Sequence, residues 1–189
     1  MPVDGVTLAS ARGPSAVALY PAAVTSEQTF SDILAANETY AAGFELRGLS
    51  GKAAKRLAVL TCMDSRIDPL GMLGLQPGDA KLLRNAGARV TDDVLRTLAL
   101  AAYLLDVDRV MVVAHTNCAM ASGTEDQIHE RIAAAGGPDT RSLRLLTTTD
   151  QETALRRDVQ RLRSWPYLSR VTVGGFVYDV DTGRVRTVC

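Results

Sequence analysis

Two short apolar runs, LAVLT at residues 57–61 and RVMVVA at residues 109–114, are separated by a segment whose apolar residues recur with helical spacing. Runs of this length without polar alternation are typical of strands buried on both faces of a sheet. Strands that alternate with helices usually pair in parallel, because the helix carries the chain back to the starting edge. The sequence therefore predicts an α/β fold with a mainly parallel β-sheet flanked by helices.

Further signals complete this prediction of a single folded domain. The turn Asp181-Thr182-Gly183 predicts a C-terminal antiparallel hairpin strand. Thr91 before two acids, and Thr149 with Glu152, are typical helix starts. The expected elements are a helix over 26–44, strands over 57–61 and 81–83, a helix over 91–105, a strand over 109–114, helices over 128–135 and 149–162, a strand over 171–180 and a short strand ending near 188.

The length and composition fit one globular domain. The chain has 189 residues, of which 47% are apolar, enough to bury one core. Residues 1–25 are weakly patterned and predict an N-terminal arm that need not be ordered, whereas residues 26–189 predict one folded α/β domain. The 21 basic and 21 acidic residues balance, so neither nucleic acid nor a membrane is an expected partner. No secretion signal or membrane-spanning run is visible, which predicts a cytoplasmic protein.

The three cysteines are odd in number and therefore do not predict a disulfide scaffold. Cys189 is the last residue and is expected to fray with the terminus. Cys62 follows the first apolar run, His115 follows the second, and Cys118 comes three residues later. Because ligands bind beyond the carboxyl ends of parallel strands, we expect these side chains to meet at one edge of the sheet.

Zinc prefers thiolate and imidazole ligands in a tetrahedron, so Cys62, His115 and Cys118 predict one zinc site. His115 and Cys118 are spaced to lie about one helical turn apart. Three protein ligands leave one position for water, the pattern of a catalytic site. Asp64 can accept a hydrogen bond from zinc-bound hydroxide, or bind the metal as a fourth ligand in a closed state. Arg66 can hold Asp64 in a bidentate pair away from the metal.

These motifs resemble those of the β-class carbonic anhydrases, in the short bacterial branch. Residues 62–66 (CMDSR) match the family's Cys-x-Asp-Ser-Arg signature, and residues 115–118 (HTNC) match its His-x-x-Cys. Residues 76–80 (QPGDA), 83–87 (LRNAG) and 175–180 (GFVYDV) resemble its linking segment and last hairpin. The resemblance runs from about residue 37 to the end of the chain.

The resemblance implies zinc-dependent, reversible hydration of carbon dioxide to bicarbonate and a proton. Zinc would lie on Cys62, His115 and Cys118, and Asp64 and Arg66 would be the catalytic pair beside it. It also implies a homodimer or a higher homo-oligomer with active sites near the subunit interface.

The sequence departs from related patterns in two places. The Gln, Phe and Tyr that line the substrate pocket of plant-type members correspond here to Ala53, Lys81 and Leu100. Bacterial relatives often read His-Thr-Asp-Cys-Gly, where this chain has Asn117 and Ala119. These changes concern the surroundings of the metal and leave its three ligands in place.

Two other functions remain open at this point. The same scaffold could hydrolyse carbon disulfide or carbonyl sulfide, which are also linear and electrophilic at carbon. Alternatively, the chain could be a non-catalytic zinc-binding module with Asp64 as a permanent fourth ligand. His129 is the other histidine, and its helical position predicts a solvated surface side chain rather than a proton carrier.

Overall fold

The computed structural model describes residues 25–189, which divide into two compact units after Glu45. The predicted arm lies outside the described residues, apart from Thr25 at its end. The predicted helix over residues 26–44 is present as two helices, α1 (Ser26–Thr29) and α2 (Ser31–Ala42). They are separated by Phe30, whose φ of −112° and ψ of 16° are not helical.

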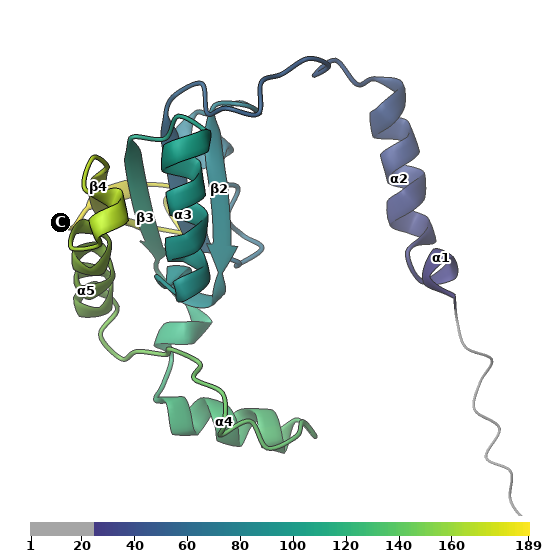
Figure 1. The fold of residues 1–189 in the computed structure, drawn as a ribbon. Helices are drawn as coiled ribbons and strands as arrows, with labels where there is room; N and C mark the ends of the chain where they lie inside the picture. Colours follow the sequence, from purple (N-terminus) through teal and green to yellow (C-terminus); the bar gives the residue numbers. More distant parts are fainter. Residues whose placement is uncertain (1–24) are drawn as a thin grey trace, which may run out of the picture. The chain divides into compact units, whose positions relative to one another are not determined.

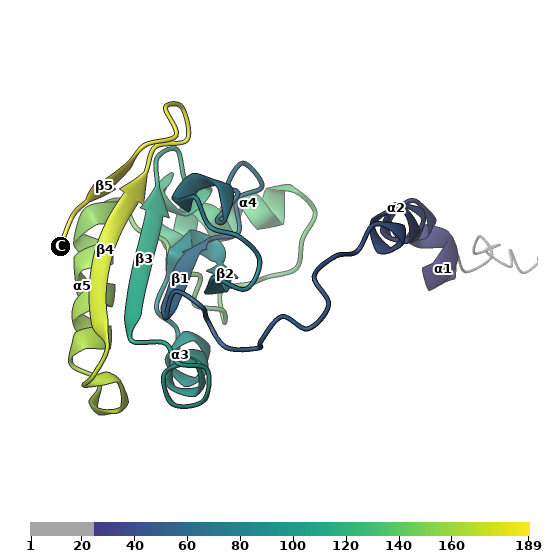
Figure 2. The same cartoon turned by 90° about the horizontal axis from the view of Figure 1, so that it is seen from above.

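The second unit is built on one five-stranded sheet in the order β2-β1-β3-β4-β5, shown in Figures 1 and 2. The first four strands are parallel to their neighbours, and β5 pairs antiparallel with β4. This confirms the predicted fold class and the C-terminal hairpin strand. The strands are β1 (Leu57–Cys62), β2 (Ala80–Asn85), β3 (Arg109–His115), β4 (Thr172–Tyr178) and β5 (Val185–Thr187).

The two faces of the sheet are covered differently. The helices α3 (Asp92–Leu104) and α5 (Gln151–Arg163) pack on one face, where they meet alternate strand residues such as Ala58 and Leu60. On the other face, Leu57 and Val59 pack against the loop that carries the short 3₁₀ helix η1 (Gly71–Leu73). The central strands are apolar on both sides because both faces are buried, as their uninterrupted runs predict.

Helix starts show where local signals decide the structure. Thr91 caps α3 as predicted, since its hydroxyl accepts a hydrogen bond from the backbone N–H of Val94. The cap of α5 is Asp150 rather than Thr149, because the Asp150 carboxylate accepts from the N–H of Thr153. The predicted helix over residues 128–135 is α4 (Glu125–Ala134), which begins at a capping box on Thr124.

The end of the chain is ordered, contrary to the prediction for Cys189. The carbonyl oxygen of Cys189 accepts a 2.8 Å hydrogen bond from the backbone N–H of Gly175, and its side chain packs against the core. The pairing of the last strand with β4 therefore continues to the final residue. Within residues 25–189, no helix combines the length and the apolar character that a membrane crossing needs.

Candidate metal centre

The site lies where β1 and β3 end. The two strands are parallel neighbours with Thr61 opposite Val113, so their carboxyl ends reach the same edge of the sheet. Cys62 is the last residue of β1 and His115 is the last residue of β3. Adjacent parallel pairing therefore brings together two side chains that the sequence separates widely, as predicted.

Cys118 reaches the site through a tight turn and not through the helical turn expected for His-x-x-Cys. Asn117 has a positive φ of 55°, in the left-handed region that asparagine tolerates better than most residues. Cys118 is then extended, with φ −76° and ψ 128°, before the short 3₁₀ helix η3 (Ala119–Ala121). The reversal at Asn117 turns the Cys118 thiol back toward the end of β3.

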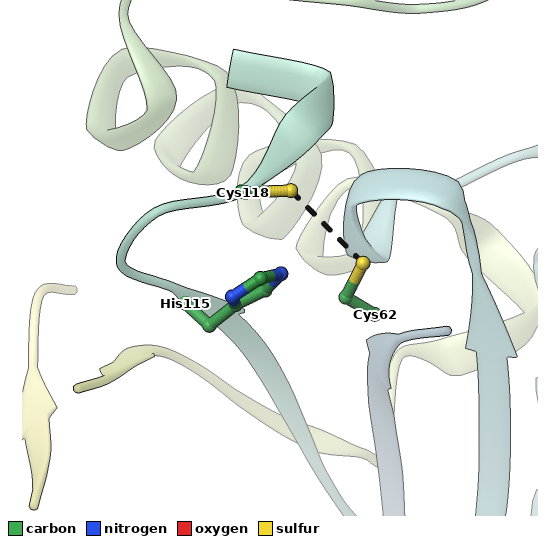
Figure 3. A group of neighbouring side chains, drawn as sticks. All are labelled: Cys62, His115 and Cys118. Carbon is green, nitrogen blue, oxygen red and sulfur yellow. Dashed lines mark hydrogen bonds between the residues drawn. The ribbon is translucent and has the colours of Figure 1, made fainter. Parts of the chain in front are cut away.

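The three potential ligands form one buried cluster (Figure 3). The Cys62 and Cys118 sulfurs are 4.0 Å apart, and all three ligand atoms lie within 4.8 Å of one another. Tetrahedral zinc with Zn–S bonds of about 2.3 Å places two sulfurs about 3.8 Å apart. The side chains are thus spaced to hold one ion with little movement.

His115 provides the clearest sign that the cluster binds a ligand. Its Nδ1 lies 2.8 Å from the carbonyl oxygen of Thr116, which can only accept, so Nδ1 carries the proton and Nε2 has a free lone pair. Among the side chains of residues 25–189, Nε2 of His115 is the one fully buried nitrogen or oxygen without a hydrogen-bond partner. Burial lowers the pKa of His115, which favours the neutral form that binds metals. In Figure 3 its ring faces the gap between the two sulfurs.

The Cys118 thiol is held in an apolar setting that disfavours its negative charge. Burial, together with the neighbouring Cys62, raises the pKa of Cys118 to about 11. Cys62 packs in the same small buried group, together with Ile67. A soft or borderline cation that binds thiolates compensates for this loss of hydration, so the donor set suits zinc.

Asp64 and Arg66 lie beside the cluster as a bidentate ion pair. The Nε of Arg66 donates to Oδ1 of Asp64 at 3.0 Å, and Nη2 donates to Oδ2 at 2.8 Å. The backbone N–H of Arg66 also donates to Oδ1, at 3.0 Å. These hydrogen bonds hold the pKa of Asp64 well below its usual range.

The Asp64–Arg66 pair also lies against His115 and the turn that leads to Cys118. Oδ2 of Asp64 lies 3.9 Å from Nε2 of His115, and Nη2 of Arg66 donates to the carbonyl oxygen of Asn117 at 3.1 Å. The side chain of Asn117 in turn donates to Asp181 at 3.3 Å, in the hairpin between β4 and β5. Asp64 therefore borders the three ligands while both its oxygens are bound by Arg66.

Arg84 is a site residue that the sequence reading missed. Its Nε donates to the carbonyl oxygen of Cys62 at 2.9 Å, and its Nη2 donates to that of Asp64 at 2.7 Å. It holds the backbone of the ligand loop from the neighbouring strand β2. An arginine directly after the two leucines of this strand, near its carboxyl end, is the signal that could have indicated this role.

His129 does not join the cluster, and the prediction of a solvated position is wrong. Its side chain is buried, and Nδ1 lies 2.8 Å from the Thr140 hydroxyl oxygen. The segment that follows α4 folds back over this face of the helix, which a helical pattern alone cannot reveal.

Comparison with known proteins gives consistent matches. The family model described as carbonic anhydrase matches residues 57–185. β-Carbonic anhydrase 1 of Mycobacterium tuberculosis is 35% identical over 164 residues, covering 83% of this chain and 96% of that protein. The crystal structure of carbonic anhydrase from Streptococcus mutans superposes with a TM-score of 0.80 at 37% identity, covering 88% and 99% of the two chains. A carbon disulfide hydrolase of Saccharolobus solfataricus is 31% identical over 169 residues, covering 76% and 82%.

Proposed function

Because this chain belongs to the carbonic anhydrase family, and to its β class, we propose that it catalyses the reversible hydration of carbon dioxide to bicarbonate and a proton. Family membership confirms the resemblance of the sequence motifs and the expected enzyme class, a carbonate dehydratase. The observation that carries the proposal is the unpartnered Nε2 of His115 beside two buried sulfurs and the Asp64–Arg66 pair.

Cys62, His115 and Cys118 would hold one zinc ion. Zinc bound by three protein ligands supplies an activated water at neutral pH, since it can lower the pKa of that water to about 7. Neutral His115 donates its Nε2 lone pair, and its Nδ1–H bond to Thr116 fixes the ring in that orientation. The two cysteines contribute the negative charge that matches the ion.

Asp64 would orient the reacting water. An ionised carboxylate only accepts hydrogen bonds, so Asp64 would accept one from the reacting water. This bond would orient the water so that its free lone pair faces the substrate. Arg66 keeps Asp64 ionised and occupies both of its oxygens, which holds the carboxylate beside the ligands and off the metal. Buried apolar side chains such as Ile67 limit the access of other water.

A stopped-flow assay of carbon dioxide hydration on zinc-loaded protein tests this proposal. We expect a rate well above that of buffer, abolished when a chelator removes the zinc and restored when zinc is added back. A zinc-loaded protein without acceleration would contradict the proposal and favour a non-catalytic zinc-binding module.

Hydrolysis of carbon disulfide is the second candidate, because relatives with that name share most of the chain. Carbon disulfide is linear and electrophilic at carbon, so the same arrangement of ligands and Asp64 suits attack on it. Hydrogen sulfide release from carbon disulfide, measured beside carbon dioxide hydration on one preparation, separates the two. We expect hydration to be the faster reaction by a wide margin.

We also predict a homodimer or a higher homo-oligomer. Large apolar side chains of the N-terminal unit, including Ile33 and Leu34, are more than half exposed. Exposed apolar side chains gathered on one short element are typical of association surfaces. Light scattering at micromolar concentration should report at least a dimer, and Ile33→Asp with Leu34→Asp should shift it toward monomer.

The matched control for this experiment is Thr39→Asp, which adds charge to helix α2 on a face away from Ile33 and Leu34 and removes no large apolar side chain. It should leave the assembly unchanged. A monomeric wild-type chain at micromolar concentration would show that the prediction is wrong.

The cytoplasmic location stays a prediction.

A further inference from the structure

The turn after β2 points a backbone N–H at one of the candidate ligands. The N–H of Gly87 donates to the Sγ of Cys62 at 3.4 Å. To do so the chain adopts left-handed conformations at two successive residues, with φ of 79° at Gly87 and 56° at Ala88. The second of these is unfavourable for a residue with a Cβ, so other contacts must hold the turn in this shape.

The side chain of Asn85 closes the turn. Its Nδ2 donates to the carbonyl oxygen of Arg89 at 2.7 Å, and its Oδ1 accepts from the N–H of Arg89 at 2.8 Å. The side-chain amide of Asn85, at the start of the turn, thus bonds both backbone polar groups of Arg89, at its end. Asparagine suits this position because aspartate lacks the donor and serine lacks the reach.

An ion pair anchors the closed turn to α5. The Nε of Arg89 donates to Oδ2 of Asp158 at 2.6 Å, and the same oxygen accepts from the N–H of Val90 at 3.2 Å. Nη1 of Arg89 donates to the carbonyl oxygen of Leu146 at 2.5 Å. The side chains of Arg89 and Asp158 are 18% and 10% exposed, so the pair is largely shielded from water. The turn therefore has little freedom to move away from Cys62.

We propose that Asn85 is a positioning residue that keeps the Gly87 N–H on the Cys62 sulfur and thereby strengthens metal binding. A thiolate ligand in an apolar setting is stabilised by an N–H dipole directed at it, and groups that orient metal ligands contribute to affinity. This inference rests on the proposed metal centre.

Zinc and cobalt(II) ions are the probes for the test. Asn85→Ala removes both bonds across the turn, and we expect zinc affinity, measured by chelator competition, to fall about 10- to 100-fold. The thiolate-to-metal charge-transfer band of the cobalt(II) protein should shift, because the charge on the Cys62 sulfur changes. Asn85→Asp keeps the acceptor and loses the donor, so its affinity should lie between those of the alanine variant and wild type.

Arg163→Ala is the matched control. Arg163 bonds α5 to the carbonyl oxygen of Val173, near the start of β4 and away from the ligands at the strand ends. The variant should lower the melting temperature while leaving zinc affinity and the cobalt band unchanged.

Gly87→Ala is an independent test in case Asn85→Ala does not fold. A Cβ at residue 87 would lie 3.2 Å from the Cβ of Met120 at a backbone φ of +79°, so it should displace the turn and weaken zinc binding. Wild-type affinity and an unshifted cobalt band in the folded variants would overturn the inference. Zinc binding by the wild type would still support the proposed function, whereas a wild type that binds no zinc would refute that function itself.

Discussion

Cys62→Ser and His115→Ala are each expected to abolish zinc binding and to lower carbon dioxide hydration by at least about a thousandfold, because the metal generates the reactive water. Three ligands are the minimum for a catalytic zinc site. Within residues 25–189, the cluster of potential ligands contains Cys62, His115 and Cys118, and the neighbouring Asp64 carboxylate is bound by Arg66. Elemental analysis of purified variants measures the zinc, and stopped-flow kinetics measures the rate.

Cys189→Ser is the control for thiol loss. Cys189 is ordered but lies outside the ligand cluster, packed against the core beside Gly175. Zinc content and hydration rate should therefore match those of the wild type. A full complement of zinc in either ligand variant, with the protein folded by circular dichroism, would remove the assignment of the metal centre.

The sequence predicts much of the fold and the ligand set because both follow from strong local signals. The apolar runs ending at Thr61 and Ala114 are short and rich in β-branched residues, which favours strands buried on both faces. Parallel pairing then brings their carboxyl ends to the same edge of the sheet. Cys62 and His115 follow directly from that placement, and Asp64 and Arg66 follow from Cys62 within one short loop.

The contacts that the sequence does not predict depend on segments that approach from elsewhere in the fold. His129 is buried because the Thr140 segment folds over it, and the end of the chain is ordered because residue 189 pairs with Gly175. Neither partner is visible in local periodicity. The bond from Gly87 to Cys62 likewise depends on two left-handed residues, and the sequence signals only the glycine.

At the start of α5, the sequence does not decide which of two adjacent residues, Thr149 or Asp150, caps the helix. Thr149 with Glu152 fits the capping-box pattern, yet Asp150 makes the cap. The carboxylate of Glu152 is occupied by Arg186, from the last strand of the sheet. In the folded chain Glu152 pairs with Arg186 instead of the backbone at the helix start, and the cap is made by Asp150.

Arg66→Ala is expected to lower the hydration rate about 100-fold or more while zinc stays bound, because the residue positions Asp64 without being a ligand. Arg66 makes three hydrogen bonds to the Asp64 carboxylate, two from its guanidinium and one from its backbone N–H. The alanine variant keeps only the backbone bond. Since Oδ2 of Asp64 already lies 3.9 Å from the Nε2 of His115, the released carboxylate can turn onto the metal and take the place of the reacting water.

Arg66→Lys is the control that separates charge from geometry. Lysine keeps the positive charge but lacks the planar fork that binds both carboxylate oxygens, so it should restore only part of the lost rate. Elemental analysis should show wild-type zinc in both variants, and a crystal structure of zinc-loaded Arg66→Ala should show Asp64 on the metal. If Asp64 is turned away from the ion and the rate is near that of the wild type, Arg66 does not hold the carboxylate off the metal. A variant that loses its zinc would instead place Arg66 among the groups that maintain the ligand loop.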